Sequence, residues 1–432
     1  MTGLNSDQTH LVEKINDPQY PGDHSLRHRL SRSMKNQKKN YMISSENLPV
    51  LRCLSRSFPE SVQFVYLDPP YNTGNQFAHY SDQLSHQSWL KFMECRLELI
   101  KPVIRPDGFI SVQIDDHEGP YLKVLMDKIF GRENYLTTFY IQVRYQQKQL
   151  KRDMAFHKQI EQILIYRKSP VAVPNQIKRS KSLEKYCYYV DEKVRGKQIR
   201  LGGKSVEIFS PEQFQLYQDQ PGPKGRKEIW ASGTILEGNS SGRFFRDFLS
   251  GRCETDGLGV LYKVYGIGRD NHNFRYFLGP RRAGATKGRY LQGVPAEQIE
   301  NPGATFPEPV ENFYDLSAAF GNCRHEGGVG FRGGKKPEKL LELLIRTFSA
   351  SGDRILDAFG GSGTTAAVAH KMKRVWTLIE SGPQCETHMK KRLELVCKGL
   401  DATGISEQYR WKGGGDFKFI RLRQTSPSHE NR

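Results

Sequence analysis

The sequence predicts an α/β fold around a mostly parallel sheet, carried by two separate segments of the chain. Short apolar runs alternate with stretches of helical spacing in residues 41–169, and the same alternation returns in 326–400. The block between them, residues 170–325, instead has glycine-rich turns and short aromatic strands. We therefore expect one discontinuous α/β domain with an inserted α+β domain, between a basic arm over 1–40 and a basic tail over 401–432.

The first segment contains the expected strands in order, each bounded by polar residues. They cover residues 41–44, 62–67, 108–114 and 161–166. Trp89 to Ile100 has apolar residues at helical spacing, and a second helix is expected to end at Gly131. Asp115 and Asp116 follow the third strand, and a structural or capping role is favoured over acid–base chemistry.

The second segment has the layout of a nucleotide-type cofactor site. A helix is expected after Pro337, and Asp353 to Ala358 is a short apolar strand. A Gly-Gly-Ser-Gly loop and a helix follow, and the next strand ends in Glu380. Glycines allow close backbone approach to a ligand, and an acid about 20 residues beyond the loop accepts hydrogen bonds from ribose hydroxyls. No lysine follows Gly363, which excludes a phosphate-binding P-loop.

The tetrad Asp68-Pro69-Pro70-Tyr71 ends the apolar run over 62–67. Prolines cannot donate ladder hydrogen bonds and they fix the backbone, so carbonyls project from the end of the strand. A carboxylate, a rigid carbonyl and an aromatic face then meet at the sheet edge where open α/β folds bind ligands. These groups suit an exocyclic amine on a planar ring.

The charge and composition of the chain indicate which kind of molecule it binds. The 432-residue chain has 65 Lys and Arg against 47 Asp and Glu, a formal charge of +18, which suits a phosphate backbone but also fits a generally basic surface. Basic and aromatic residues are interleaved in 170–325, the texture of a nucleic-acid contact surface or of an irregular domain core. The seven cysteines form no CxxC pair and the histidines no ligand cluster, so reduced thiols and no metal are expected.

The two motifs together resemble those of amino-group DNA methyltransferases that use S-adenosylmethionine. Asp357-Ala358-Phe359-Gly360-Gly361-Ser362-Gly363 matches the cofactor loop of that family, and Asp68-Pro69-Pro70-Tyr71 matches its catalytic tetrad. The tetrad precedes the loop, which is the permuted order of the β class. The stretches over 41–166 and 331–395 look most like the modification subunits of type III restriction systems.

The resemblance implies a Rossmann-like, circularly permuted methyltransferase fold with a mixed, mostly parallel seven-stranded sheet, and the insertion as its target-recognition domain. It implies S-adenosylmethionine as cofactor, adenine N6 in double-stranded DNA as target, and no covalent intermediate. The catalytic set is Asp68, Pro69, Pro70 and Tyr71. The implied cofactor-binding set is Glu46, Lys336, Asp357, Phe359, Gly361, Gly363, Thr364, Thr365 and Glu380. The implied DNA-binding set is Asn72, Phe77, Tyr80, Lys224, Arg226 and Lys227.

Alternatives remain at this stage. Cytosine N4 presents a similar amine, and RNA or a protein glutamine could also use such a tetrad, although their methyltransferases usually have the opposite motif order. A catalytically inactive DNA-binding module would have a broken motif, and both motifs are intact. With no membrane span or signal peptide expected, the chain is assigned to the prokaryotic cytoplasm. Neither a homodimer nor a restriction endonuclease partner can be decided from the sequence.

Overall fold

The computed structural model describes most of the chain. The described residues are 13–17, 30–32, 34, 38–74, 83–147, 156–180, 182–231, 240–268, 270–282, 284–285, 287–301, 303, 305–331 and 333–424. They form two compact units, one made of Met1–Gln176 and Val310–Arg432 and the other of Ile177–Pro309. The inserted unit is therefore shorter at both ends than the predicted block over 170–325.

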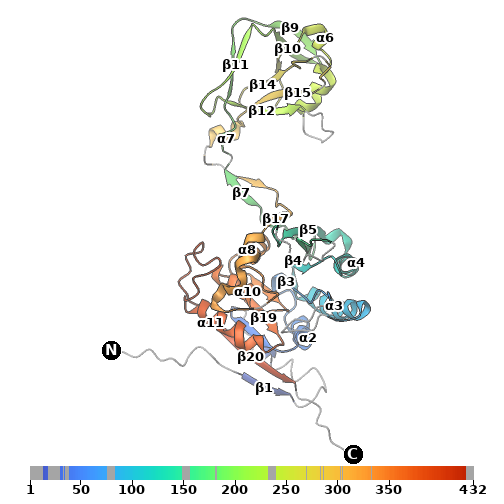
Figure 1. Ribbon diagram of the computed structural model, residues 1–432, viewed down its shortest axis with the longest axis vertical. Coiled ribbons are helices and arrows are strands. Elements are labelled where there is room, and N and C mark those ends of the chain that lie inside the picture. The colour runs from blue at the N-terminus through green and yellow to red at the C-terminus, as the bar shows by residue number, and fades with distance from the viewer. Residues whose placement is uncertain are drawn as a thin grey trace, which may run out of the picture. The chain divides into compact units, whose positions relative to one another are not determined.

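The first unit is built on a sheet with ten described strands (Figure 1). Their order across the sheet is β1 (Glu13–Asp17), β20 (Phe417–Gln424), β2 (Asn40–Ser44), β19 (Val375–Glu380), β18 (Arg354–Asp357), β3 (Val62–Leu67), β4 (Ile104–Ile114), β6 (Ile160–Arg167), β5 (Tyr135–Gln142) and β17 (Phe313–Asp315). Neighbouring strands are parallel except that β6 is antiparallel to both β4 and β5. The seven strands from β2 to β5 form the predicted mixed, mostly parallel core.

The chain order of the two motif strands confirms the permuted arrangement. The tetrad strand β3 and the glycine-loop strand β18 lie far apart in sequence but are parallel neighbours, with Leu356 opposite Val65. Their carboxyl ends therefore meet at one edge of the sheet, where both motifs begin.

Helices cover both faces of this sheet. One apolar cluster packs α2 (Asn47–Ser57), α3 (His86–Ile100) and α4 (Gly119–Phe130) against one face. A second cluster packs α9 (Glu338–Phe348), α10 (Thr364–Lys371) and α11 (Lys391–Cys397) against the other, and the short α8 (Ser317–Asn322) follows β17. Burial on both faces explains why the central strands are nearly continuous apolar runs. No helix among the described residues is long and apolar enough to cross a membrane.

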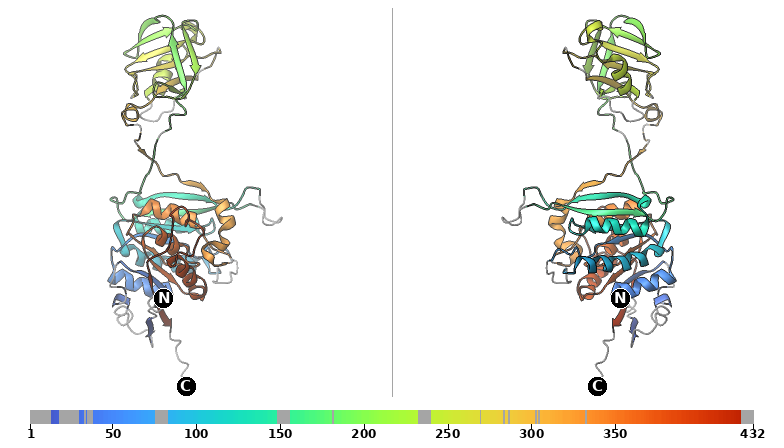
Figure 2. Two further views of the ribbon diagram at one scale, coloured as in Figure 1. Left: turned by 90° about the vertical axis from the view of Figure 1, so that its left-hand side faces the viewer. Right: turned by 90° about the vertical axis from the view of Figure 1, so that its right-hand side faces the viewer.

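The second unit is an antiparallel, curved sheet with short helices against it (Figure 2). Its strand order is β11 (Phe214–Gln218), β8 (Tyr188–Glu192), β12 (Arg226–Ala231), β15 (Gly288–Gly293), β14 (Phe274–Leu278), β13 (Leu261–Tyr265), β10 (Lys204–Phe209) and β9 (Lys197–Leu201). The pair β7 (Ile177–Ser180) and β16 (Thr305–Glu308) and the helices α5 (Ser240–Phe244), α6 (Cys253–Asp256) and α7 (Ala296–Glu300) complete it. Phe244, Phe245 and Leu249 pack on one face of this sheet.

Three strands at or next to the sheet edges correct the predicted boundaries. β20 lies in the predicted tail, but it pairs with β2, and Phe419 and Ile420 are buried on opposite faces of the sheet. β1 lies in the predicted arm and pairs with β20, whereas β17 lies in the predicted insertion and pairs with β5. The two edge strands β1 and β17 are short, and in β20 the apolar residues are interleaved with basic ones, so none of the three has the continuous apolar run of a central strand.

Candidate active site

A cavity of about 520 Å³ lies at the carboxyl edge of the first sheet. Ligand sites in folded proteins have volumes of this order. Parallel strands all end at this edge, and the antiparallel β6 begins there. The lining therefore combines residues that follow β2, β3, β4, β18 and β19 with the first residues of β6. Among them are Ser45, Glu46, Asp68, Tyr71, Asp115, Ile160, Glu161, Phe359 and Glu380.

All four residues of the tetrad line this cavity. Asp68 follows the last residue of β3, and its side chain is 18% exposed. The Trp89 indole, buried on α3, donates a hydrogen bond from Nε1 to the Pro70 carbonyl at 2.7 Å. Trp89 therefore holds the turn in place, and the Pro70 carbonyl already accepts a hydrogen bond from within the protein.

Two residues from distant segments complete a charged cluster at the tetrad. The Tyr71 hydroxyl lies 3.0 Å from Asp68 Oδ1 and 2.8 Å from Glu161 Oε2. Lys336 Nζ lies 3.2 Å from Asp68 Oδ1, 3.0 Å from Glu161 Oε2 and 2.8 Å from the Tyr71 hydroxyl. Lys336 was expected at the cofactor, but its ammonium lies at the tetrad, because α9 begins beside the ends of β3 and β6.

Burial and pairing shift the ionisation of this cluster. Burial raises the pKa of Asp68 to about 6; the Lys336 cation opposes this rise and Glu161 adds to it. Burial also raises the pKa of Glu161, but the ion pair with Lys336 outweighs it, so that pKa is below its usual range. Burial lowers the pKa of Lys336, but the two carboxylates raise it by more, so the net shift is upward. The ammonium of Lys336 therefore stays charged near neutral pH, whereas Asp68, with a pKa of about 6, changes its protonation state just below neutral pH.

The glycine loop has the backbone that the motif requires. Gly361 and Gly363 have φ of +50° and +79°, a region that L side chains rarely adopt. A Cβ on Gly363 would also lie 2.9 Å from Met389 Cγ. The Gly361 N–H donates to Glu380 Oε2 at 2.7 Å, which ties the loop to the end of β19.

Glu380 and Gln384 form a polar corner of the cavity. Glu380 Oε1 accepts from the N–H groups of Ser381 and Gly382 and from Gln384 Nε2, each at 2.9 Å. Burial raises the pKa of Glu380, and these backbone donors oppose the rise. Gln384 is 4% exposed, and its Oε1 has no hydrogen-bond donor among the described residues. A buried acceptor without a donor at a cavity wall indicates a ligand that donates.

Four predicted cofactor residues, Asp357, Gly363, Thr364 and Thr365, do not line the cavity. Asp357 is 2% exposed and accepts from the Phe359 N–H at 2.8 Å and the Thr365 hydroxyl at 2.6 Å. Thr364 is buried and accepts from Arg392 at 2.6 Å. The hydrogen bonds of Asp357 hold the loop in shape, and its direct contact with the cofactor stays a prediction.

The opposite wall is formed by the start of α2 and by α3. Glu46 lines the cavity, with its Oε2 3.7 Å from the Arg96 guanidinium. Asn47, which also lines the cavity, donates to the Ala358 carbonyl at 2.9 Å. Phe92 and Phe359 line it with ring centroids 6.0 Å apart. Phe92 is one of the helically spaced apolar residues of 89–100; it packs against the core and also forms part of the cavity wall.

Three residues near the tetrad, Asn72, Phe77 and Tyr80, were predicted to contact DNA. The Asn72 amide donates to Glu118 at 2.8 Å and accepts from the Leu84 N–H at 2.9 Å, so both of its ends are used within the protein. Asn72 also has a φ of +59°, which its loop position requires. Phe77 and Tyr80 lie outside the described residues.

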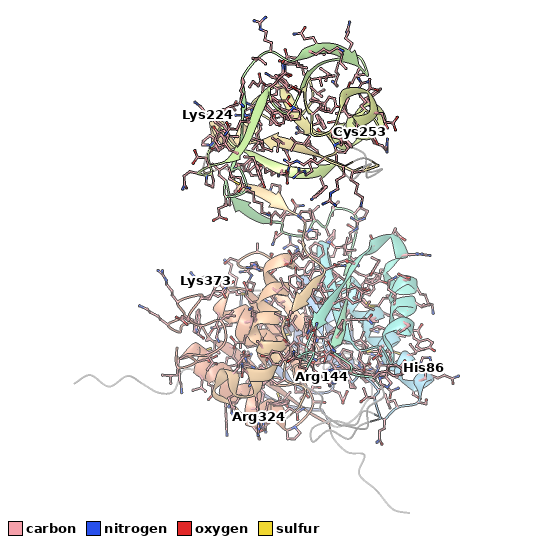
Figure 3. All side chains as sticks on the ribbon, turned by 45° about the horizontal axis from the view of Figure 1, so that its top comes forward. His86, Arg144, Lys224, Cys253, Arg324 and Lys373 are labelled. Atoms are coloured by element: carbon pink, nitrogen blue, oxygen red, sulfur yellow. The ribbon has the colours of Figure 1, made fainter. Side chains whose placement is uncertain are left out.

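The basic triplet of the second unit separates into different environments. Lys224 is exposed (Figure 3). Lys227 is half-buried, with Nζ 5.5 Å from the ring centroid of Tyr186. Arg226 is 8% exposed, and its guanidinium lies 4.9 Å from the Tyr276 ring centroid. This corrects the assignment of Arg226 to DNA contact, because part of the basic–aromatic interleaving forms cation–π contacts inside the unit.

Several cavity residues were not predicted from the sequence as site residues. Glu161 and Gln384 are the most informative, and the others include Asn47, Phe92, Asp115, Arg144 (Figure 3), Lys158 and Ser381. The sequence signal available for Glu161 was an acid at the start of a strand that runs antiparallel to its neighbours, because such a strand begins at the edge of the sheet that holds the cavity. No sequence pattern pointed to Gln384.

Asp115, Asp116 and His117 form a group whose ligand atoms could hold a metal ion. Lys158 Nζ lies 2.8 Å from Asp116 Oδ1 and 3.1 Å from His117 Nδ1. The ammonium of Lys158 offsets one of the two carboxylate charges. The structural role expected for the two aspartates stays a prediction.

Comparison with known proteins identifies the family of this chain. A family model described as DNA methylase matches residues 62–391. A probable type III restriction-modification enzyme Mod subunit from Haemophilus influenzae, HindVI, is 31% identical over 409 residues, covering 89% of this chain and 54% of that protein. The StyLTI Mod subunit from Salmonella typhimurium is 30% identical, covering 76% of this chain and 49% of that protein. The chain thus spans about half the length of these curated relatives.

Proposed function

Because this chain belongs to the DNA methylase family, we propose that it transfers a methyl group from S-adenosylmethionine to the N6 amino group of a specific adenine in double-stranded DNA. The observation that carries the proposal is the meeting of Asp68 and Tyr71 with the glycine loop and Glu380 around one cavity. The restriction-modification names of the relatives support DNA as the substrate.

The cavity suits the proposed cofactor. When bound, S-adenosylmethionine supplies a methyl group activated by a positively charged sulfur. Glu380 and the free Oε1 acceptor of Gln384 would accept from ribose hydroxyls, and Phe359 and Phe92 would pack against the adenine ring. Gly361 allows the backbone to approach the ligand, and Glu46 adds a second carboxylate at the same wall.

The tetrad suits a flipped-out base. A base inside a duplex cannot reach the cavity, so it must leave the stack at a cost of a few kcal/mol. Stacking on Tyr71 would offset part of that cost, since base–aromatic stacking contributes about 1–3 kcal/mol. The aromatic amine is a weak nucleophile because its lone pair is delocalised into the ring.

Two acceptors at the tetrad would restore that lone pair. Lys336 and Tyr71 both lie at Asp68 Oδ1, whereas Oδ2 has no hydrogen bond to a described residue. Oδ2 would accept one N–H of the amine and the Pro69 carbonyl the other, since the Pro70 carbonyl is held by Trp89. The Asp68 carboxylate then stabilises the positive charge that develops on nitrogen and accepts the proton released from it.

Methylation of cytosine N4 is the alternative reaction. Both bases present an amine beside a ring nitrogen, and the same two acceptors could serve either one. Aspartate in the first tetrad position and the likeness to type III Mod subunits favour adenine. An RNA or a protein glutamine substrate is less consistent with the permuted motif order.

A transfer assay tests the proposal directly. Tritium from labelled S-adenosylmethionine is expected to enter duplex DNA, and not RNA or protein. Modification-detecting sequencing of DNA from cells that express the chain should then report N6-methyladenine at one recurring sequence. Incorporation only into RNA or protein, or N4-methylcytosine at that sequence, would replace the proposed reaction.

The second unit is proposed to select the target sequence. Exchanging residues 177–309 with the corresponding unit of a relative is expected to move the methylated site and leave the reaction unchanged. Sequencing of methylated DNA checks this, and a chimera that is active on the original site would refute the assignment.

We further propose that duplex binding depends on two lysines of this unit. Replacing Lys224 and Lys227 by Ala should weaken binding to all sequences alike and reduce the log–log salt slope by about 0.9 for each phosphate that the variant no longer neutralises. Binding titrations at several salt concentrations measure this slope. Arg226→Ala is the contrasting variant: it should lower the melting temperature, because the guanidinium packs on Tyr276 inside the unit. An unchanged slope in the double variant would contradict the proposal.

The restriction-modification names of the relatives support a restriction endonuclease partner as a proposal. A homodimer is a separate proposal. Sedimentation of the chain with and without a co-expressed nuclease tests both. The bacterial cytoplasm, where the chromosome lies, is the proposed place of action.

A further inference from the structure

We propose that Lys336 and Glu161 are positioning residues for Asp68 and Tyr71, and that their opposite charges set the pH range in which the amine can be methylated. The inference rests on the proposed function. It follows from a four-residue cluster whose members come from the turn after β3, from β6 and from the residues just before α9, segments that only the fold brings together.

The geometry makes Lys336 the centre of the cluster. Its side chain is 9% exposed, and its ammonium lies within 3.2 Å of Asp68 Oδ1, Glu161 Oε2 and the Tyr71 hydroxyl. These partners account for the three N–H donors of a lysine. The ammonium thereby holds Oδ1 of Asp68 and leaves Oδ2 as the oxygen available to the base amine.

Glu161 is held in turn from the neighbouring strand. Gln113 Nε2 on β4 donates to Glu161 Oε2 at 2.5 Å, and the Tyr66 hydroxyl on β3 donates to Gln113 Oε1 at 2.6 Å. Tyr66 and Gln113 are both buried. This relay keeps Glu161 near Tyr71 and fixes the Tyr71 hydroxyl, so that the ring presents a constant surface to a base.

The charges in the cluster act on Asp68 in opposite directions. The Lys336 cation favours the ionised form of Asp68, and the Glu161 carboxylate disfavours it. The other titratable groups that act electrostatically with Asp68 are Tyr71, Tyr66 and Asp357. Only ionised Asp68 can both accept from the amine and take up its proton, so methyl transfer should rise with pH through the titration of the cluster.

The test is the acid limb of the rate profile for methyl transfer to a duplex oligonucleotide at saturating S-adenosylmethionine. Lys336→Met removes the cation, keeps an unbranched side chain, and should move the limb to higher pH by about one unit or more. Glu161→Gln is nearly isosteric, removes the opposing carboxylate, and should move the limb to lower pH. The double variant should lie between the two single variants.

Two controls separate positioning from packing. Lys336→Arg keeps the charge and should restore the limb of the wild type even if kcat is lower. Lys128→Met removes a lysine of the exposed ion pair with Glu94, outside the cavity, and should leave the profile unchanged. Calorimetric titration with S-adenosylmethionine shows whether each variant is folded and binds cofactor.

The outcomes are decisive in both directions. Limb shifts of opposite sign support the inference, and the downward shift in Glu161→Gln is sufficient if Lys336→Met does not fold. Lower kcat with an unmoved limb, or shifts of the same sign, would overturn it. Absence of methyl transfer in the wild-type protein would instead refute the proposed function.

Discussion

Asp68→Ala is expected to reduce kcat for methyl transfer by about 10³-fold or more. In the proposed reaction, the carboxylate supplies both the acceptor that makes the amine nucleophilic and the negative charge that stabilises the transition state. Loss of a single electrostatic contact of this kind typically costs about 10²–10³-fold in other enzymes, and Asp68 serves in two ways. Single-turnover assays with labelled S-adenosylmethionine and a duplex containing the target site measure the effect.

The matched variant is Asp68→Asn, which keeps the shape of the side chain and one oxygen acceptor. It should retain more activity than Asp68→Ala and lose the acid limb of the pH profile, because the amide does not titrate. Cofactor affinity should be nearly unchanged in both variants, since Asp68 faces the base. Turnover near the wild-type rate in Asp68→Ala would contradict the mechanism.

Glu380→Ala is expected to weaken S-adenosylmethionine binding by about 10- to 100-fold. A hydrogen bond to a charged group contributes about 1.5–3 kcal/mol, and Glu380 also ties Gly361 and Gln384 to the cavity wall. Gly363→Val should weaken binding at least as much, because it combines a φ of +79° with a Cβ 2.9 Å from Met389 Cγ. Isothermal titration calorimetry measures both dissociation constants.

Gly352→Val is the control for backbone strain. Gly352 has a φ of +87° in the turn before β18, and a Cβ there would meet no atom within 4 Å. The variant should lose stability without losing cofactor affinity. If Glu380→Ala and Gly363→Val both bound S-adenosylmethionine like the wild type, the cofactor pocket would have to lie elsewhere.

The two motifs and the strands that carry them could be predicted from sequence because their geometry is local. A strand that ends in Asp68-Pro69-Pro70-Tyr71 presents the same groups whatever packs around it, since the prolines fix the backbone. The loop before Gly363 requires positive φ, and glycine is the residue that adopts it readily. The central α/β pattern was equally accessible, because strands buried on both faces are recognisable as apolar runs.

Strands near the sheet edges and charge partners could not be predicted in this way. β20 was assigned to a tail because its apolar residues are interleaved with basic ones, although it lies inside the sheet between β1 and β2. Arg226 was assigned to DNA contact because the sequence does not show which ring its guanidinium group meets inside the second unit.

The cluster at the tetrad was decided only by the tertiary structure. Asp68, Glu161 and Lys336 are separated by long stretches of chain, yet carboxylate oxygens of both acids lie within 3.2 Å of the same ammonium. Electrostatic interactions depend on distance through space and on burial, and neither quantity is a property of a local motif. The chemistry of the tetrad was therefore present in the sequence, whereas the control of its ionisation depends on how β3, β6 and α9 meet.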